Sequence, residues 1–151
     1  MPSVSLTGKD VVQLDGRVLA DLGDGDSVMI TYPNDLTVVK TAKNGNTIFG
    51  FNETGRQVEC TLRILSGSAD DKYLNSRLQE GKSDFSAFNL VSGSFTKRVG
   101  DGAGNISSIV YAMTGGSFKK QVEAKTNADG DSEQSITTYV LHFGNGDRSV
   151  Q

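Results

Sequence analysis

The chain has 151 residues, a length that suits one domain (residues 1–151) whose core folds without disulfides or metal. Its net charge of −3 and pI near 5.1 exclude a protein whose main task is to grip nucleic acid, because that affinity comes mostly from Lys and Arg. Only 36% of the residues are hydrophobic and 18 are glycine, which favours sheets with polar faces and many turns.

The N-terminal region predicts short strands. Val11 to Leu14 and Arg17 to Leu19 flank Asp15-Gly16, a hairpin signal because this dipeptide tolerates the positive φ of a two-residue turn. A further strand is expected from Val28 to Tyr32, where Pro33 ends it or places it at an edge because proline donates no hydrogen bond.

Two strands are then expected around a polar break. They cover Leu36 to Thr41 and Thr47 to Phe51, and the break is Lys43-Asn44-Gly45-Asn46, so the region predicts a long hairpin. After a second break at Asn52 to Arg56, the clearest strand runs from Gln57 to Leu65. Its apolar side carries Val58, Cys60, Leu62 and Ile64, and its polar side carries Gln57, Glu59, Thr61 and Arg63.

One helix is predicted at about residues 69–80. Ser68 suits its N-cap, Asp70 and Asp71 suit its first turn, and Gly81 is placed just past its end. The pairs Ala69 with Tyr73 and Leu74 with Leu78 give a narrow apolar stripe. The residues mostly outside it are Lys72, Asn75, Arg77, Gln79 and Glu80.

Four long strands are expected after the helix, which suggests an antiparallel sheet. They are Ala87 to Val99, Ile106 to Thr114, Ser117 to Lys125 and Glu133 to Phe143. Gly115-Gly116 is interpreted as a turn or bulge, and Ser149 to Gln151 as a frayed terminus. A polar sheet face carrying Glu59, Arg63, Lys119 and Glu123 either meets solvent or lines a lumen.

Three segments come close to known chemistry and depart from it. Gly81-Lys82-Ser83 ends a helix where a phosphate loop would open one. The glycines of Gly100 to Asn105 lack the dinucleotide spacing, so a hairpin loop is expected. Asn127, Asp129, Asp131 and Glu133 alternate like calcium ligands, but Ser132 and Thr138 occupy the required glycine and glutamate positions.

The cysteine and histidine content of the chain does not provide a known combination of catalytic residues. Cys60 is the only cysteine and is expected to be an inert core thiol, and His142 is the only histidine and falls mid-strand. No nucleophile elbow occurs, and two residues are too few for zinc. We therefore expect no enzyme, no metal and no cofactor. The first ten residues lack a signal-peptide core and no apolar run approaches about 20 residues, so we expect synthesis in the cytosol and no membrane partner.

Three segments carry a resemblance to a known family: Asn34 to Asn46, Ser66 to Asn75 and Lys97 to Gly102. They resemble the tail tube proteins of contractile-tailed bacteriophages, and the likeness extends over nearly the whole chain. The resemblance implies a mainly β fold, an antiparallel sandwich or barrel with one flanking helix, whose strands join a ring-closed barrel in the oligomer. It also implies hexameric rings that stack into a tube of the virion tail, made in the host cytoplasm.

The same resemblance implies partners and contact residues. The tube would contact the tail sheath, baseplate and tail terminator proteins, while the tape measure protein and then DNA pass through its lumen without specific binding. Lys40, Lys43, Asn44 and Asn46 would form a polar tip between stacked rings, unless they belong to an ordinary solvated turn. Lys72 and Arg77 would face the sheath.

Other interpretations remain open. A tube subunit of a phage-like bacteriocin or secretion particle would share the architecture. A small monomeric β-barrel that binds a ligand or peptide is the alternative from another class, and it predicts a stable monomer with a pocket. An enzyme that depends on His142 stands third.

Overall fold

The computed structural model describes residues 5–6, 10–23, 27–124 and 135–150. Over these residues the chain is mainly β with one α-helix, as expected. The elements are β1 (Ser5–Leu6), β2 (Val11–Leu14), β3 (Arg17–Leu19), β4 (Val28–Thr31), β5 (Thr37–Thr41), β6 (Thr47–Phe51), the 3-10 helix η1 (Glu53–Arg56), β7 (Val58–Leu65), α1 (Ala69–Ser83), the 3-10 helix η2 (Phe85–Ala87), β8 (Val91–Gly100), β9 (Ile106–Phe118) and β10 (Ile136–Val150).

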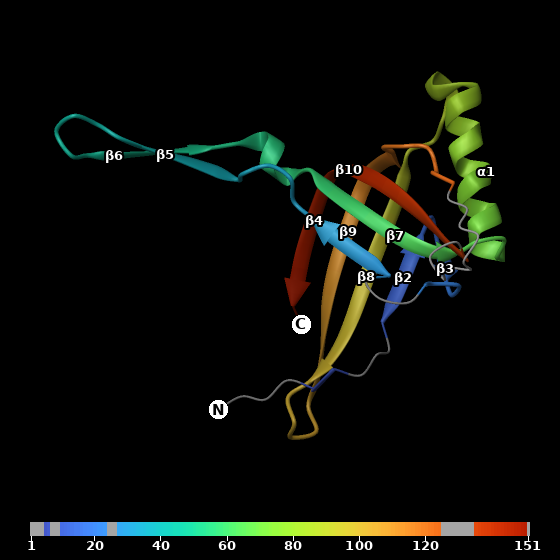
Figure 1. The fold of residues 1–151 in the computed structure, drawn as a ribbon. Helices are drawn as coiled ribbons and strands as arrows, with labels where there is room; N and C mark the ends of the chain where they lie inside the picture. The colour runs from blue at the N-terminus through green and yellow to red at the C-terminus, as the bar shows by residue number, and fades with distance from the viewer. Residues whose placement is uncertain (1–4, 7–9, 24–26, 125–134, 151) are drawn as a thin grey trace, which may run out of the picture.

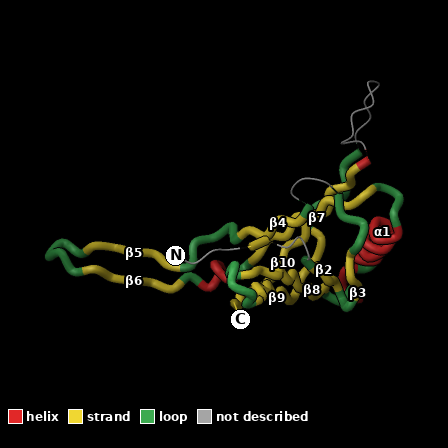
Figure 2. Tube along the Cα trace, turned by 90° about the horizontal axis from the view of Figure 1, so that it is seen from below, coloured by secondary structure: helices red, strands yellow, loops and turns green. Residues whose placement is uncertain are grey.

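One antiparallel sheet forms the body of the molecule. Its strand order is β3-β2-β8-β9-β10-β7-β4, with β1 added beside β8. The sheet curls into a half-barrel, and α1 flanks it near β3 (Figures 1 and 2). The strands β5 and β6 pair only with each other among the described residues and extend away from the body. The predicted mainly antiparallel fold with one flanking helix is therefore confirmed.

The core lies inside the curl and follows the predicted alternation of β7. Its apolar positions Val58, Cys60, Leu62 and Ile64 are buried. They pair in register with Phe143, Leu141, Tyr139 and Thr137 of β10. Leu74 and Leu78 of α1 are also buried, whereas Ala69 is exposed, so only one of the two predicted helix pairs is fully packed.

Two strands were expected on either side of Gly115-Gly116, which was interpreted as a turn or bulge, but the double glycine does not separate them. β9 runs through it to Phe118. Gly115 has a φ of +67°, and a Cβ on Gly116 would overlap the ring of Phe143 on β10. The pair therefore bends a continuous strand and makes room for a core aromatic ring.

The ends of three other predicted strands also differ. Residues 87–90 precede β8, and Ala87 belongs to η2. Only Ser117 and Phe118 of the predicted strand 117–125 are strand residues; 119–124 form neither helix nor strand, and Lys125 lies outside the described residues. β10 continues to Val150 because Ser149 and Val150 pair with β9, so the expectation of fraying was wrong for them. Glu133 and Gln151 lie outside the described residues.

The start of α1 was predicted correctly and its end was not. The Ser68 hydroxyl accepts a hydrogen bond from the Asp71 amide at 3.2 Å, which is a side-chain N-cap. The helix includes Gly81 and ends at Ser83, since Asp84 is extended and caps η2 instead. No described helix has both the length and the apolar character needed to cross a membrane.

Candidate assembly surfaces

The β5–β6 ribbon, residues 36–51, is the most exposed apolar feature of the molecule. Figures 1 and 2 both show it leaving the body. Phe49 is 73% exposed, and the other large apolar side chains that are exposed on the ribbon are Leu36, Val38, Val39, Ile48 and Phe51. An isolated two-stranded ribbon is only marginally stable in water, and a contiguous apolar surface of this kind marks an interaction site.

The tip of the ribbon brings the predicted inter-ring residues together. Lys43, Asn44 and Asn46 lie in the turn and Lys40 lies on β5 beside it, and all are exposed. The Asn44 Oδ1 atom accepts a hydrogen bond from the Asn46 amide at 3.1 Å, and Gly45 has a φ of +90°. The turn is therefore ordered by its own side chains and leaves both lysines free to meet a partner.

A clasp of side chains holds the base of the ribbon. The Asn34 amide group donates to the Thr54 carbonyl at 3.2 Å, and the Asn52 amide group donates to the Asp35 carbonyl at 3.0 Å. Gly55 is buried, and a Cβ there would lie 2.6 Å from the Leu36 Cα atom. From the sequence, residues 52–56 were expected to form only a break between strands. In the structure, the hydrogen bonds and the close packing of these residues hold the base of the ribbon against the sheet.

The outer face of the sheet carries part of the predicted polar set. The Lys119 ammonium group and the Glu59 carboxylate form an ion pair at 3.0 Å. They line an open hollow of about 440 Å³, together with Ser117 and His142, which is cross-strand to Glu59. Arg63 lies on the same face of β7. Lys119 and Glu123 both follow the end of β9, but Glu123 is not among the residues that line the hollow.

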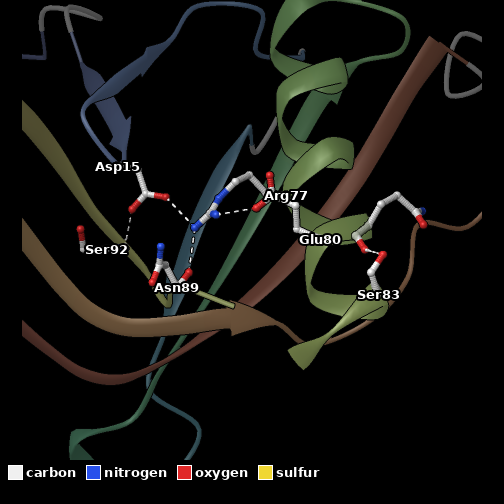
Figure 3. Close-up of polar contacts among 7 residues, drawn as sticks. Asp15, Arg77, Glu80, Ser83, Asn89 and Ser92 are labelled. Carbon is white, nitrogen blue, oxygen red and sulfur yellow. Dashed lines mark hydrogen bonds and ion pairs between the residues drawn. The ribbon is translucent and has the colours of Figure 1, made fainter. Parts of the chain in front are cut away.

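The two candidate sheath-facing residues of α1 have different environments. Lys72 is exposed, whereas the Arg77 side chain is only 16% exposed. Arg77 forms ion pairs with Asp15 at 3.1 Å and Glu80 at 2.9 Å, and it donates to the Asn89 carbonyl at 2.8 Å (Figure 3). Its guanidinium also lies over the Phe88 ring. Arg77 therefore fastens the helix to the β2–β3 turn, and only Lys72 is presented outward.

Asp70, which the sequence predicted only to suit the first turn of the helix, is buried. Its side chain accepts hydrogen bonds from the Ala20 and Asp21 amides at 2.7 and 2.8 Å and pairs with Arg17 at 3.1 Å. Burial alone would raise the pKa of Asp70, but the two amides and the Arg17 guanidinium outweigh it and lower that pKa. No sequence signal separated Asp70 from Asp71, since both suit a first turn.

Two edges of the sheet are open in the single chain. Among the described strands, β3 pairs only with β2 and β4 pairs only with β7. Val18 on β3 and Met29 on β4 are both exposed large apolar residues. Unpaired edges that end in short strands accept a strand from another chain or must be protected from one.

The described residues form no metal site, since no three His, Cys, Asp or Glu side chains among them lie close enough together. Burial raises the pKa of the Cys60 thiol to about 12, as suits a core residue. Lys82 and Ser83 end α1, and Gly100 to Asn105 joins β8 to β9, so both of those interpretations are confirmed. Asn127, Asp129 and Asp131 lie outside the described residues.

The fold can be compared with known proteins. It is similar to the cryo-EM structure of a sheath/tube terminator of PVC, an extracellular contractile injection system, in its extended state. The TM-score is 0.57 at 10% sequence identity, and the match covers 94% of each chain. At this identity the likeness is one of fold. No protein-family model and no curated protein sequence matches the chain.

Proposed function

We propose that the chain is a structural subunit of the tube of a contractile tail, in which rings of copies stack through the β5–β6 ribbon. The ribbon is the observation that carries this proposal. Its large apolar side chains are exposed among the described residues, with Arg56 lying over the Phe51 ring at the base, and the ribbon projects from the body. The full-length likeness of fold to a sheath/tube terminator supports the same class of assembly.

The open edges support the inference that copies close into a ring. No described strand pairs with the outer sides of β3 and β4, and neighbours in a ring would cover both edges. We infer six copies to a ring from the sequence resemblance alone. Such a ring uses backbone pairing and packing rather than chemistry, so no enzymatic activity is expected.

The lumen is proposed to be lined by the polar outer face of the sheet. Because Glu59 and Lys119 neutralise each other there, the face would hold a passing polymer weakly. The tape measure protein and then DNA would pass along it. Lys72 would face the sheath, and charge reversal at Lys72 that leaves sheath binding intact would count against that contact. The baseplate and tail terminator would cap the two tube ends.

A tube terminator is a second candidate, since the similar structure is described as one. A terminator would form a single ring, whereas a tube subunit stacks without limit. A phage tail and a phage-like bacteriocin or secretion particle remain alternatives within the tube class. A small monomeric binding module would instead keep its ribbon exposed at every concentration.

Electron microscopy of the purified protein, before and after concentration and with a tail or baseplate fraction as nucleator, tests these candidates. Stacked hollow tubes would support the tube subunit, and single rings would favour the terminator. Monomers under every condition would overturn the assembly proposal. The double variant Val39→Ser, Phe49→Ser is expected to abolish stacking, while Leu90→Ser, an equally exposed apolar site outside the ribbon, leaves it intact.

A further inference from the structure

The hollow of about 440 Å³ on the outer face of the sheet has a floor of glycine. Gly115 of β9 and Gly144 of β10 line it from neighbouring strands. Beyond its chain neighbours, a Cβ on Gly115 would meet no atom within 4 Å, and one on Gly144 would meet only the Gly115 carbonyl oxygen, at 3.8 Å. Because both strands lack a side chain at this point, the floor leaves room for a small molecule within a single copy of the chain.

One wall of the hollow is an ion pair that stays accessible to solvent. The Lys119 ammonium group and the Glu59 carboxylate are 3.0 Å apart, and their side chains are 40% and 26% exposed. His142 is cross-strand to Glu59, and Ser117 is cross-strand to His142, so an imidazole ring and a hydroxyl group line the hollow beside the pair. Among the described residues, Glu59 is the only acid that lines the hollow and Lys119 the only lysine or arginine. The wall therefore has no net charge from this pair but has a strong local dipole.

An ion pair of this kind selects a ligand that carries both charges. A lone cation attracted by Glu59 also meets the Lys119 ammonium group nearby, and a lone anion attracted by Lys119 meets the Glu59 carboxylate, so attraction and repulsion largely cancel. An α-amino acid carries its ammonium and carboxylate groups about 3 Å apart, because a single Cα atom separates them. Its ammonium group can therefore lie at Glu59 and its carboxylate at Lys119 while the ion pair stays intact.

We propose that this hollow is a binding site for a free α-amino acid, held by the Glu59–Lys119 pair with its side chain over Gly115 and Gly144. The Pro33 ring also lines the hollow, which suits a small apolar side chain. A peptide does not present the same pair, because its terminal amino and carboxyl groups belong to different residues. All the lining residues come from one copy, so the inference does not depend on assembly into a tube. Since the charge contacts are open to water, we expect a Kd in about the millimolar range.

Saturation-transfer difference NMR on the full-length protein tests the inference, because it detects weak ligands of monomers and of assemblies. The probes are L-alanine, propionate, which lacks the ammonium group, ethylamine, which lacks the carboxylate, and the dipeptide alanyl-alanine. We expect L-alanine to bind saturably and at least about fivefold more tightly than each of the others. Absence of saturable L-alanine binding, or equal binding of all four probes, would overturn the proposal and leave the tube proposal untouched.

Variants place the binding in this hollow. Lys119→Met removes the ammonium group, and Gly144→Val fills the floor while leaving both charges in place. Each is expected to weaken L-alanine binding by at least about fivefold, with thermal unfolding as the check that the variant is folded. Lys120→Met, at the neighbouring exposed lysine that does not line the hollow, is the matched control and is expected to bind as wild type does. Unchanged binding by a folded Lys119→Met or Gly144→Val variant would overturn the assignment of the site.

Discussion

Arg17 and Asp70 lie 53 residues apart in the chain, yet their side chains meet in an ion pair at 3.1 Å. Arg17 is on β3 and Asp70 is in the first turn of α1, so the pair joins the helix to the edge of the sheet. The same carboxylate accepts the Ala20 and Asp21 amides, and the Arg17 guanidinium lies over the ring of Tyr73. One buried acid thus organises both the turn after β3 and the start of the helix.

Replacing Asp70 with Asn is expected to lower the free energy of unfolding by about 2–4 kcal/mol, because two backbone amides and a guanidinium lose their anionic acceptor. Since the fold lowers the pKa of Asp70, its contribution is present above the ordinary value near 3.9 and is lost as the pH falls below it. Urea unfolding at pH 7, 5 and 3 measures this effect.

The difference in unfolding free energy between wild type and Asp70→Asn should therefore be constant above about pH 5 and should shrink toward pH 3. The exposed Asp10→Asn variant is the control and is expected to stay within about 0.5 kcal/mol of wild type at pH 7. A difference that does not change with pH would contradict the role of the carboxylate charge.

Arg77→Ala is expected to cost about 2–3 kcal/mol, since it removes two ion pairs, the hydrogen bond to the Asn89 carbonyl and the stacking on Phe88. Lys72→Ala on the exposed side of the same helix should change stability by no more than about 0.5 kcal/mol. Unfolding of both variants in guanidinium chloride measures the difference between their free energies of unfolding. Equal effects would mean that Arg77 acts only as a surface charge.

Gly81→Ala is expected to stabilise the chain by about 0.5–1 kcal/mol, because Gly81 lies inside α1 and alanine is the better helix former. A methyl group there would meet Phe88 at 3.6 Å, an ordinary contact distance. Gly67→Ala is the control with the opposite expected sign. Gly67 has a φ of +79°, which is unfavourable for a residue with a side chain, so this variant should be destabilised by about 1 kcal/mol. Thermal unfolding measures both variants, and a lower melting temperature for Gly81→Ala would contradict the helical assignment.

Short sequence patterns correctly predicted those elements that are determined by residues close together in the chain. The Asp15-Gly16 hairpin formed because Asp15 and Gly16 both adopt positive φ, at 52° and 82°. The alternation of β7 placed its buried residues correctly, since one face of that strand is covered along its whole length. Ser68 was identified as the N-cap because its hydroxyl needs only the amide three residues ahead.

The remaining features depend on partners distant in sequence. Two strands were expected on either side of Gly115-Gly116, interpreted as a turn or bulge, because the overlap with Phe143, which requires glycine at 116, involves a strand formed much later in the chain. Glycine likewise predicted a stop at Gly81, where neighbouring residues sustain the helix. Among the candidate contact residues, the sequence could place Lys40 and Lys43 at a hairpin tip, but not the pairing of Arg77 with Asp15, which spans 62 residues.

The apolar ribbon would also give the proposed assembly a particular response to temperature and salt. Hydrophobic contacts weaken on cooling, and excluded salts such as sulfate strengthen them. Rings joined through Val39, Phe49 and Ile48 are therefore expected to separate in the cold and to reform on warming or on addition of ammonium sulfate. A joint made mainly by Lys40 and Lys43 would show the opposite salt response, because added ions screen it.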